Sequence, residues 1–223
     1  MKYLSWDQKT VTDFSEENIH EMYEKGYLFT RLGRGVMQQT RSVRINLAKF
    51  SLSSENRRIL KKTFDLIGPT PIELTHTSYD WHYDWKIGKM AKDFYDNKFE
   101  PGIMSSQKVK MMLVEGEKSN FNLLLIYSQD GTNIGYVICY KNKEILHYCF
   151  PFYSLDVPLK DMGLGMMIKA IQYAKESKLK YFYLGSLQRA SDVYKLQFEG
   201  LEWFDGKVWS QDIEDVKNIL KSL

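Results

Sequence analysis

The sequence predicts an α+β fold with a mixed central sheet and flanking helices. Three runs rich in β-branched and aromatic residues follow one another at 121–128, 134–140 and 145–153, with short polar turns between them. Such runs predict an antiparallel meander. A glycine-containing segment, an amphipathic helix ending near Lys178 and a buried strand at 181–185 come next. A strand, a helix and a strand in this order predict a right-handed crossover, which adds a parallel strand to the sheet.

The residues before the meander predict a smaller amino-terminal α/β part. Ser15 and the acidic residues after it are typical of a helix start, and Lys25-Gly26 is typical of a helix end. Strands are expected at 27–30 and 41–47, because apolar and polar residues alternate in the second of these segments. A second helix, with a basic face, is expected at 56–65.

Glycine and proline residues at 68–71 predict a break in the chain. We therefore expect an amino-terminal basic part at 1–70 and a second domain at 71–223, or one compact unit that includes both. The poorly periodic residues 103–120 predict a loop, or a short strand at 109–114.

Composition indicates a folded globular protein, with 43% hydrophobic and 26% charged residues. The net charge of +3 is too small to indicate a polyanionic partner by itself. Cys139 and Cys149 lie inside predicted strands and are expected to be core residues, as is usual in a reducing cytoplasm. We expect a cytoplasmic protein, because no signal-peptide core or membrane-spanning run is present. We also expect no metal site.

Basic residues are concentrated between positions 31 and 62, where only Glu55 opposes them. Such a segment predicts contacts with a nucleic-acid backbone, and an ordinary solvated surface is the alternative. The nine basic residues are Arg31, Arg34, Arg41, Arg44, Lys49, Arg57, Arg58, Lys61 and Lys62.

A second anion site is predicted where the glycine-containing segment opens the helix. Exposed backbone N–H groups at a helix start bind phosphates, and a simple tight turn is the alternative reading of the two glycines. The candidate phosphate-binding residues are Lys160, Met162, Gly163, Leu164 and Gly165.

The meander, the glycine segment, the helix and the last strand together resemble the GNAT acyltransferase superfamily. In that superfamily the corresponding loop commonly holds the pyrophosphate of acetyl-CoA. Lys160 stands where the superfamily usually has arginine or glutamine.

Two separated segments also resemble the arginyl- or leucyl-tRNA–protein transferases, GNAT-fold enzymes that add an amino acid to protein amino termini. The segment from Arg41 to Ile45 is similar to the family's "PxRI" strand, and Arg57-Arg58 to its double-arginine helix start. Tyr183-Leu184-Gly185 and Tyr194-Lys195 are similar to its "YLG" and "YK" elements. The family's amino-terminal cysteines have no counterpart here, so no metal or haem function is carried over.

The resemblance implies transfer of an amino acid of the Arg or Leu type from tRNA to the α-amine of a protein or peptide, as in N-degron formation. Aminoacyl-tRNA would be the co-substrate, with no cofactor and no membrane partner. The implied catalytic residues are Tyr194, Lys195 and Glu202, with His147 as a second candidate for proton relay or a core histidine. The tRNA end would lie at Lys160 and Met162 to Gly165. The acceptor stem would lie along Arg41, Arg44, Arg57, Arg58, Lys61 and Lys62.

Two alternatives remain open from the sequence. One is a CoA-dependent N-acetyltransferase that uses the same loop for acetyl-CoA. The other is an inactive GNAT-fold module that binds tRNA or a protein. The basic amino-terminal part favours tRNA, because CoA does not require it.

Overall fold

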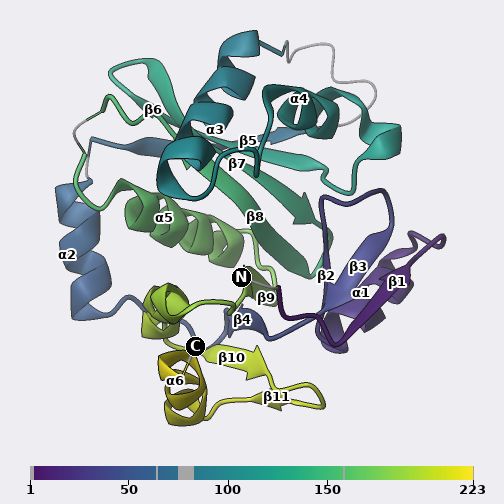
Figure 1. Ribbon diagram of the computed structural model, residues 1–223. Helices are drawn as coiled ribbons and strands as arrows, with labels where there is room; N and C mark the ends of the chain where they lie inside the picture. Colours follow the sequence, from purple (N-terminus) through teal and green to yellow (C-terminus); the bar gives the residue numbers. More distant parts are fainter. Residues whose placement is uncertain (1–2, 64, 75–82, 158, 223) are drawn as a thin grey trace. The chain divides into compact units, whose positions relative to one another are not determined.

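A computed structural model describes residues 3–63, 65–74, 83–157 and 159–222 (Figure 1). The chain divides into two compact units. Unit 1 contains Met1–Ser53, Asn142–His147 and Ala174–Leu223, and unit 2 contains Ser54–Lys141 and Tyr148–Tyr173. Unit 1 thus takes residues from both sides of the boundary expected near residue 70, because strands from the two ends of the sequence pair with each other.

Unit 1 contains a small antiparallel sheet and part of a larger one. The small sheet has the order β1-β3-β2, and helix α1 precedes β2 in the chain. These elements are β1 (Asp7–Thr10), α1 (Glu16–Glu24), β2 (Tyr27–Phe29) and β3 (Val36–Gln39). Ser15 caps α1 as predicted, with its hydroxyl oxygen accepting a 3.4 Å hydrogen bond from Asn18 N–H.

The larger sheet has the order β11-β10-β4-β9-β8 within unit 1. Strand β4 is antiparallel to both β9 and β10, whereas β9 is parallel to the first three residues of β8, which confirms the predicted parallel strand. The unit ends with helix α6. The remaining elements are β4 (Ser42–Asn46), β9 (Tyr181–Ser186), the 3-10 helix η2 (Ala190–Gln197), β10 (Leu201–Phe204), β11 (Trp209–Ser210) and α6 (Ile213–Lys221).

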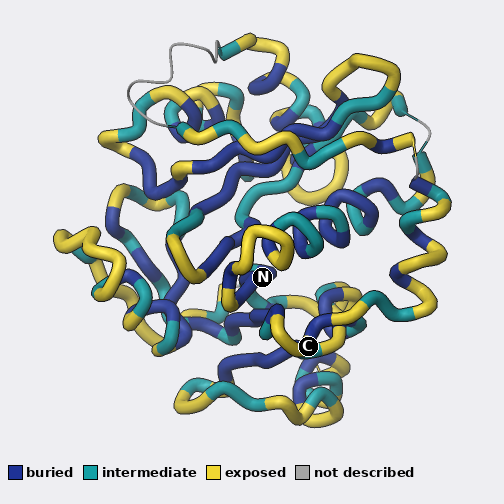
Figure 2. Tube along the Cα trace, turned by 180° about the vertical axis from the view of Figure 1, so that it is seen from behind, coloured by how far each residue is buried: buried dark blue, intermediate teal, exposed yellow. Residues whose placement is uncertain are grey.

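Strand β8 (Ile145–Tyr153) continues into unit 2, where the sheet order is β8-β7-β6-β5. The pairing of β6 with β7 is antiparallel, as expected for the meander, and both strands are largely buried (Figure 2). The other elements are α2 (Ser54–Lys62), β5 (Ile67–Glu73), α3 (Trp85–Lys98), α4 (Ser106–Val114), the 3-10 helix η1 (Gly116–Lys118), β6 (Leu123–Gln129), β7 (Thr132–Lys141) and α5 (Met162–Glu176). Together with unit 1, this confirms the α+β class with a mixed sheet and helices.

Two local predictions in unit 2 are wrong. Strand β5 runs through the proline-rich segment that was expected to break the chain, because it lies at the edge of the sheet, where proline is tolerated. Helix α4 replaces the expected loop or strand. Ser105 caps this helix, and the helical spacing of Val109, Met112 and Leu113 buries one face.

Candidate functional site

The first candidate site lies in unit 1, where strand β9 ends at Ser186. The Nζ of Lys195 donates a 2.7 Å hydrogen bond to the carbonyl oxygen of Ser186 and lies 3.4 Å from Oδ1 of Asp192. Lys195 is 9% exposed, and burial lowers the pKa of its ammonium, although Asp192 opposes this shift. A buried, hydrogen-bonded ammonium next to a strand end can stabilise negative charge that develops on a bound substrate.

Tyr194 differs from its neighbour Lys195 in exposure. Its residue surface is 41% exposed, and its ring centroid lies 5.8 Å from the Nζ of Lys195. Burial of the hydroxyl end, together with Asp192, raises the pKa of Tyr194 to about 12. The phenol therefore remains protonated near neutral pH and can donate a hydrogen bond.

His147 is a core residue. Its Nδ1 lies 2.9 Å from the hydroxyl of Tyr23, and only 3% of the residue is exposed. Burial, with a smaller effect of Lys195, lowers the pKa of His147 to about 3. The imidazole is therefore neutral at physiological pH, in agreement with the core alternative.

Arg44 does not point to a solvent surface. It lies on the opposite side of strand β4 from the apolar residues, as predicted, but this side is also covered, and Arg44 is 4% exposed. Its Nε donates to Glu202 at 2.8 Å, and its Nη1 donates to Glu24 at 2.6 Å. The guanidinium carbon lies 3.8 Å and 4.0 Å from the ring centroids of Tyr181 and Trp209. The expected contact of Arg44 with tRNA is therefore corrected to an internal ion-pair network.

Glu202 belongs to the same network. Its Oε2 accepts from Arg44, its Oε1 accepts a 3.2 Å bond from Gln211, and the residue is 7% exposed. Both carboxylate oxygens are thus engaged. The expected role of Glu202 in proton transfer is corrected to holding the guanidinium of Arg44 in place.

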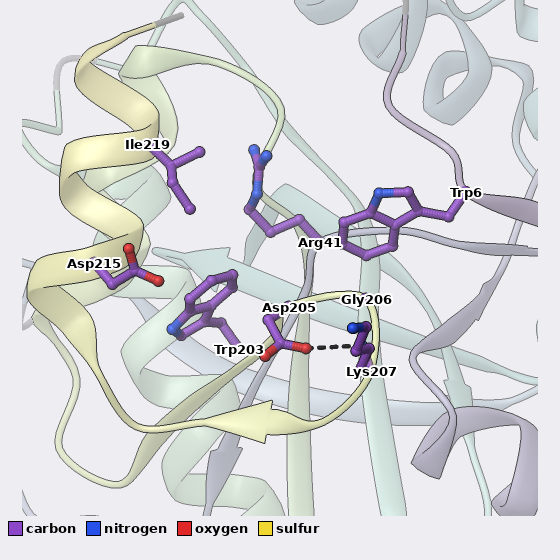
Figure 3. Close-up of a pocket in the computed structure, with 8 residues that line it drawn as sticks. All are labelled: Trp6, Arg41, Trp203, Asp205, Gly206, Lys207, Asp215 and Ile219. Atoms are coloured by element: carbon purple, nitrogen blue, oxygen red, sulfur yellow. Dashed lines mark hydrogen bonds between the residues drawn. The ribbon is translucent and has the colours of Figure 1, made fainter.

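Arg41 lines a pocket of about 590 Å³ in unit 1 (Figure 3). In Figure 3 its side chain lies between those of Trp6 and Ile219. Two carboxylates, from Asp205 and Asp215, lie on the same walls, so the pocket presents both signs of charge beside aromatic surface. Tyr194, Lys195 and Glu202 do not line it.

The predicted phosphate segment lies in unit 2, at the start of helix α5. The N–H of Gly165 already donates to the carbonyl oxygen of Asp161 at 2.9 Å, and a Cβ at Gly165 would lie 2.6 Å from Oγ1 of Thr63. Close packing against Thr63 therefore accounts for Gly165, and its expected phosphate contact is corrected. Lys160 is exposed, Met162 is buried, and Gly163 and Leu164 are half-buried.

The helix start also carries an acidic group. The Oδ2 of Asp161 accepts a 3.0 Å hydrogen bond from Nζ of Lys62, and this bond lowers the pKa of Asp161. An ionised carboxylate at this position repels a phosphate, whereas the ammonium groups of Lys62 and Lys160 near it favour an anion.

The basic face of helix α2 is exposed, as predicted. Arg57, Arg58 and Lys61 are exposed and Lys62 is half-buried. Glu55 accepts a 2.6 Å hydrogen bond from Nε of Arg58. Both Arg58 and Lys62 thus have carboxylate partners, one of which, Asp161, is distant in sequence.

The sequence did not single out Asp192, which shapes the end of strand β9 together with Gln188. Oδ2 of Asp192 accepts from the backbone N–H groups of Gln188 and Arg189 at 2.8 and 3.0 Å, which fixes this turn. Asp192 stands three residues after Arg189, the residue before η2, and an acidic side chain at this spacing can accept from the backbone N–H at the helix start, which was the available signal.

No protein-family model matches the chain. The chain is similar to an aspartate/glutamate leucyltransferase from Ruegeria sp. (strain TM1040), with 25% identity over 174 residues, covering 76% of this chain and 61% of that protein. It therefore spans about three fifths of the length of this relative. Similar solved structures include L-PGS from Bacillus licheniformis, with 15% identity, 92% of this chain and 70% of that chain covered, and a TM-score of 0.46. FemX has 8% identity, 80% and 61% coverage and a TM-score of 0.49.

Among the described residues, no helix has the length and apolar character needed to cross a membrane. The same residues contain no group of three or more His, Cys, Asp or Glu side chains arranged to hold a metal ion.

Proposed function

We propose that this protein transfers an aminoacyl group from tRNA to the α-amine of a protein or peptide. The observation that carries this proposal is the similarity to an aspartate/glutamate leucyltransferase over 76% of the chain. The proposal is also supported by Lys195 of the 3-10 helix η2, which matches the "YK" element of the tRNA–protein transferases and whose buried ammonium binds the carbonyl oxygen of Ser186 at the end of strand β9.

In this reaction the amine nitrogen forms a bond with the ester carbonyl carbon, and the bond to the tRNA 3′ oxygen breaks. One amine proton ends on that oxygen. An α-amine has a pKa of about 7.7 to 8.0, so a useful fraction is neutral near pH 7 and no strong base is required. Positioning and charge stabilisation then supply most of the rate enhancement.

Glu202 and His147 have structural roles. Stabilisation of the oxyanion and donation of a further hydrogen bond are therefore left to Lys195 and Tyr194. The ammonium of Lys195 stabilises the oxyanion that forms at the ester carbonyl. The protonated hydroxyl of Tyr194, whose pKa is raised to about 12, donates a hydrogen bond at the same wall. The exposed residues Arg57 and Lys61 of helix α2 contact the tRNA backbone.

The test is transfer of radiolabelled amino acid from mixed aminoacyl-tRNAs to peptides with acidic amino termini. We expect activity in the intact chain and a loss of at least about 100-fold in kcat/KM for Lys195→Met. Lys98→Met, at an exposed lysine outside the basic segment 31–62, is the matched control. No transfer with any aminoacyl-tRNA, together with acetyl transfer from acetyl-CoA, would favour the N-acetyltransferase instead.

A further inference from the structure

An internal peptide segment occupies the end of strand β9 in unit 1. The hydroxyl of Tyr3 lies 2.8 Å from Oγ of Ser186. One residue later, the N–H of Leu4 donates to Oε1 of Gln188 at 2.7 Å, and Nε2 of Gln188 donates to the carbonyl oxygen of Leu4 at 3.2 Å. We call residues 3–6 the strap, and Thr40, Ser186 and Gln188 the strap site.

The strap site recognises main-chain groups of Leu4. Besides the two bonds with Gln188, the hydroxyl of Thr40 donates to the carbonyl oxygen of Leu4 at 2.7 Å, and Nε2 of Gln188 donates to Oγ1 of Thr40 at 2.7 Å. Every peptide residue except proline presents the same N–H and C=O pair. This site can therefore hold an extended peptide with little regard to its side chain at this position.

The strap site is positioned in part by contacts that do not involve the strap. The N–H of Thr40 donates to the carbonyl oxygen of Gly26 at 3.4 Å, and the backbone N–H of Gln188 donates to Oδ2 of Asp192 at 2.8 Å. The rings of Tyr3 and Trp6 are 51% and 41% exposed, although the N–H of Trp6 donates to the carbonyl oxygen of Gln39 at 2.9 Å and its ring packs edge-on against Phe204. The exposed parts of these two rings bury no apolar area, so a competing peptide that makes the same main-chain bonds as Leu4 can displace residues 3–5 of the strap.

The strap site adjoins the proposed active site through a single residue. Ser186 binds the strap by its hydroxyl and binds Nζ of Lys195 by its carbonyl oxygen. Trp6 of the strap also lines the pocket that contains Arg41, so displacement of the strap alters one wall of that pocket (Figure 3).

We propose that the strap site binds the acceptor peptide, and that the strap occupies this site as an internal competitor. The proposal rests on the proposed function for the identity of the peptide as an acceptor. A peptide that displaces the strap has its main chain read by Gln188 and Thr40 and lies beside Lys195. The apparent affinity of the site for a peptide is then the intrinsic affinity multiplied by the fraction of molecules in which the strap is released.

The test compares Leu4→Pro with Leu4→Ala in the full chain, without tRNA. Proline removes the N–H that donates to Gln188, whereas alanine keeps it. The probe is a peptide with a free amino-terminal aspartate and fluorescein at its other end, and binding is followed by fluorescence anisotropy. We expect Leu4→Pro to lower the Kd by about 3- to 10-fold, and Leu4→Ala to stay within about twofold of the unaltered chain.

A second substitution examines the site itself. Gln188→Leu, added to Leu4→Pro, is expected to raise the Kd at least about 10-fold, because both main-chain bonds are lost. Equal Kd values for Leu4→Pro and Leu4→Ala, or no effect of Gln188→Leu, would overturn the proposal.

Competition in the unaltered chain covers the case in which Leu4→Pro does not fold. The peptide acetyl-Tyr-Leu-Ser-Trp-Asp-Gln-amide should displace the labelled peptide, and its analogue with proline in place of leucine should not. Equal displacement by both peptides overturns the proposal. Strap-dependent binding without aminoacyl transfer would contradict the proposed function and leave the peptide site standing, whereas transfer without strap dependence would do the reverse.

Discussion

Substitution of Arg44, which lies at the centre of an internal ion-pair network, is expected to lower the free energy of unfolding strongly. In Arg44→Met, the carboxylate of Glu202, whose side chain is only 10% exposed, loses its cationic partner. The side chain of Glu24 is 35% exposed and is rehydrated in this variant. Loss of its ion pair with Arg44 therefore adds little to the cost. Removal of one partner from a buried pair costs about 3–5 kcal/mol in the free energy of unfolding.

The aromatic contacts act in the same direction. The guanidinium lies between the rings of Tyr181 and Trp209, and a desolvated cation–π contact contributes about 2 kcal/mol. Methionine retains part of the packing, so we keep about 3–5 kcal/mol as the expected total. Glu202→Gln retains an oxygen for Nε of Arg44 and should cost only about 1–2 kcal/mol.

The assay is urea unfolding at pH 7, read by circular dichroism. With an m-value of about 2 kcal/mol/M, Arg44→Met should lower the midpoint by about 1.5–2.5 M. The double variant Arg44→Met/Glu202→Gln should lose less than the sum of the single variants, because the stranded charge is gone. An unchanged midpoint for Arg44→Met, accompanied by weaker tRNA binding, would refute the internal network and restore Arg44 as a surface contact.

Two further predictions follow from buried residues. His147 binds a proton in the unfolded chain with a pKa of about 6.5 but in the folded chain only near 3, so stability should fall by about 1.4 kcal/mol per pH unit below pH 6.5. His147→Gln should flatten this dependence in urea titrations between pH 7 and pH 5, and an identical slope in both proteins would contradict the assigned shift. Gly165→Ala should destabilise by about 1–3 kcal/mol through contact with Thr63, whereas Gly163→Ala, with nothing closer than 3.4 Å, should be neutral or stabilising. Equal unfolding midpoints for the two alanine variants would show that packing does not explain Gly165.

Local signals in the sequence were sufficient for much of the fold. The meander, the cap at Ser15 and the parallel strand β9 follow from apolar runs, turn residues and their order along the chain. These signals extend over a few neighbouring residues, so no tertiary information is needed. Helix α4 was missed because its apolar stripe is short, and the cap at Ser105 is a single residue.

The candidate site depends more on residues that are distant in sequence. Period-two alternation placed Arg44 away from the apolar face, but it could not show that Glu24 and Trp209 cover the other face. The reason for glycine at position 165 is Thr63, and Gln188 gains its role from Leu4. Sequence spacing singled out Lys195 as a candidate, yet its partner Ser186 is defined only by where strand β9 ends.

Fewer than nine residues of the basic segment 31–62 are open to contact with a polyanion. Of its nine basic residues, at least Arg44, Arg58 and Lys62 have carboxylate partners, so at most six can neutralise phosphates without giving up such a partner. Because binding to duplex nucleic acid weakens with salt by a slope of about 0.9 per neutralised phosphate, this segment supports a slope of at most about 5. A steeper measured slope for tRNA binding would mean that basic residues elsewhere in the chain contact the tRNA, whereas a shallower one is what the internal pairing of these three residues requires.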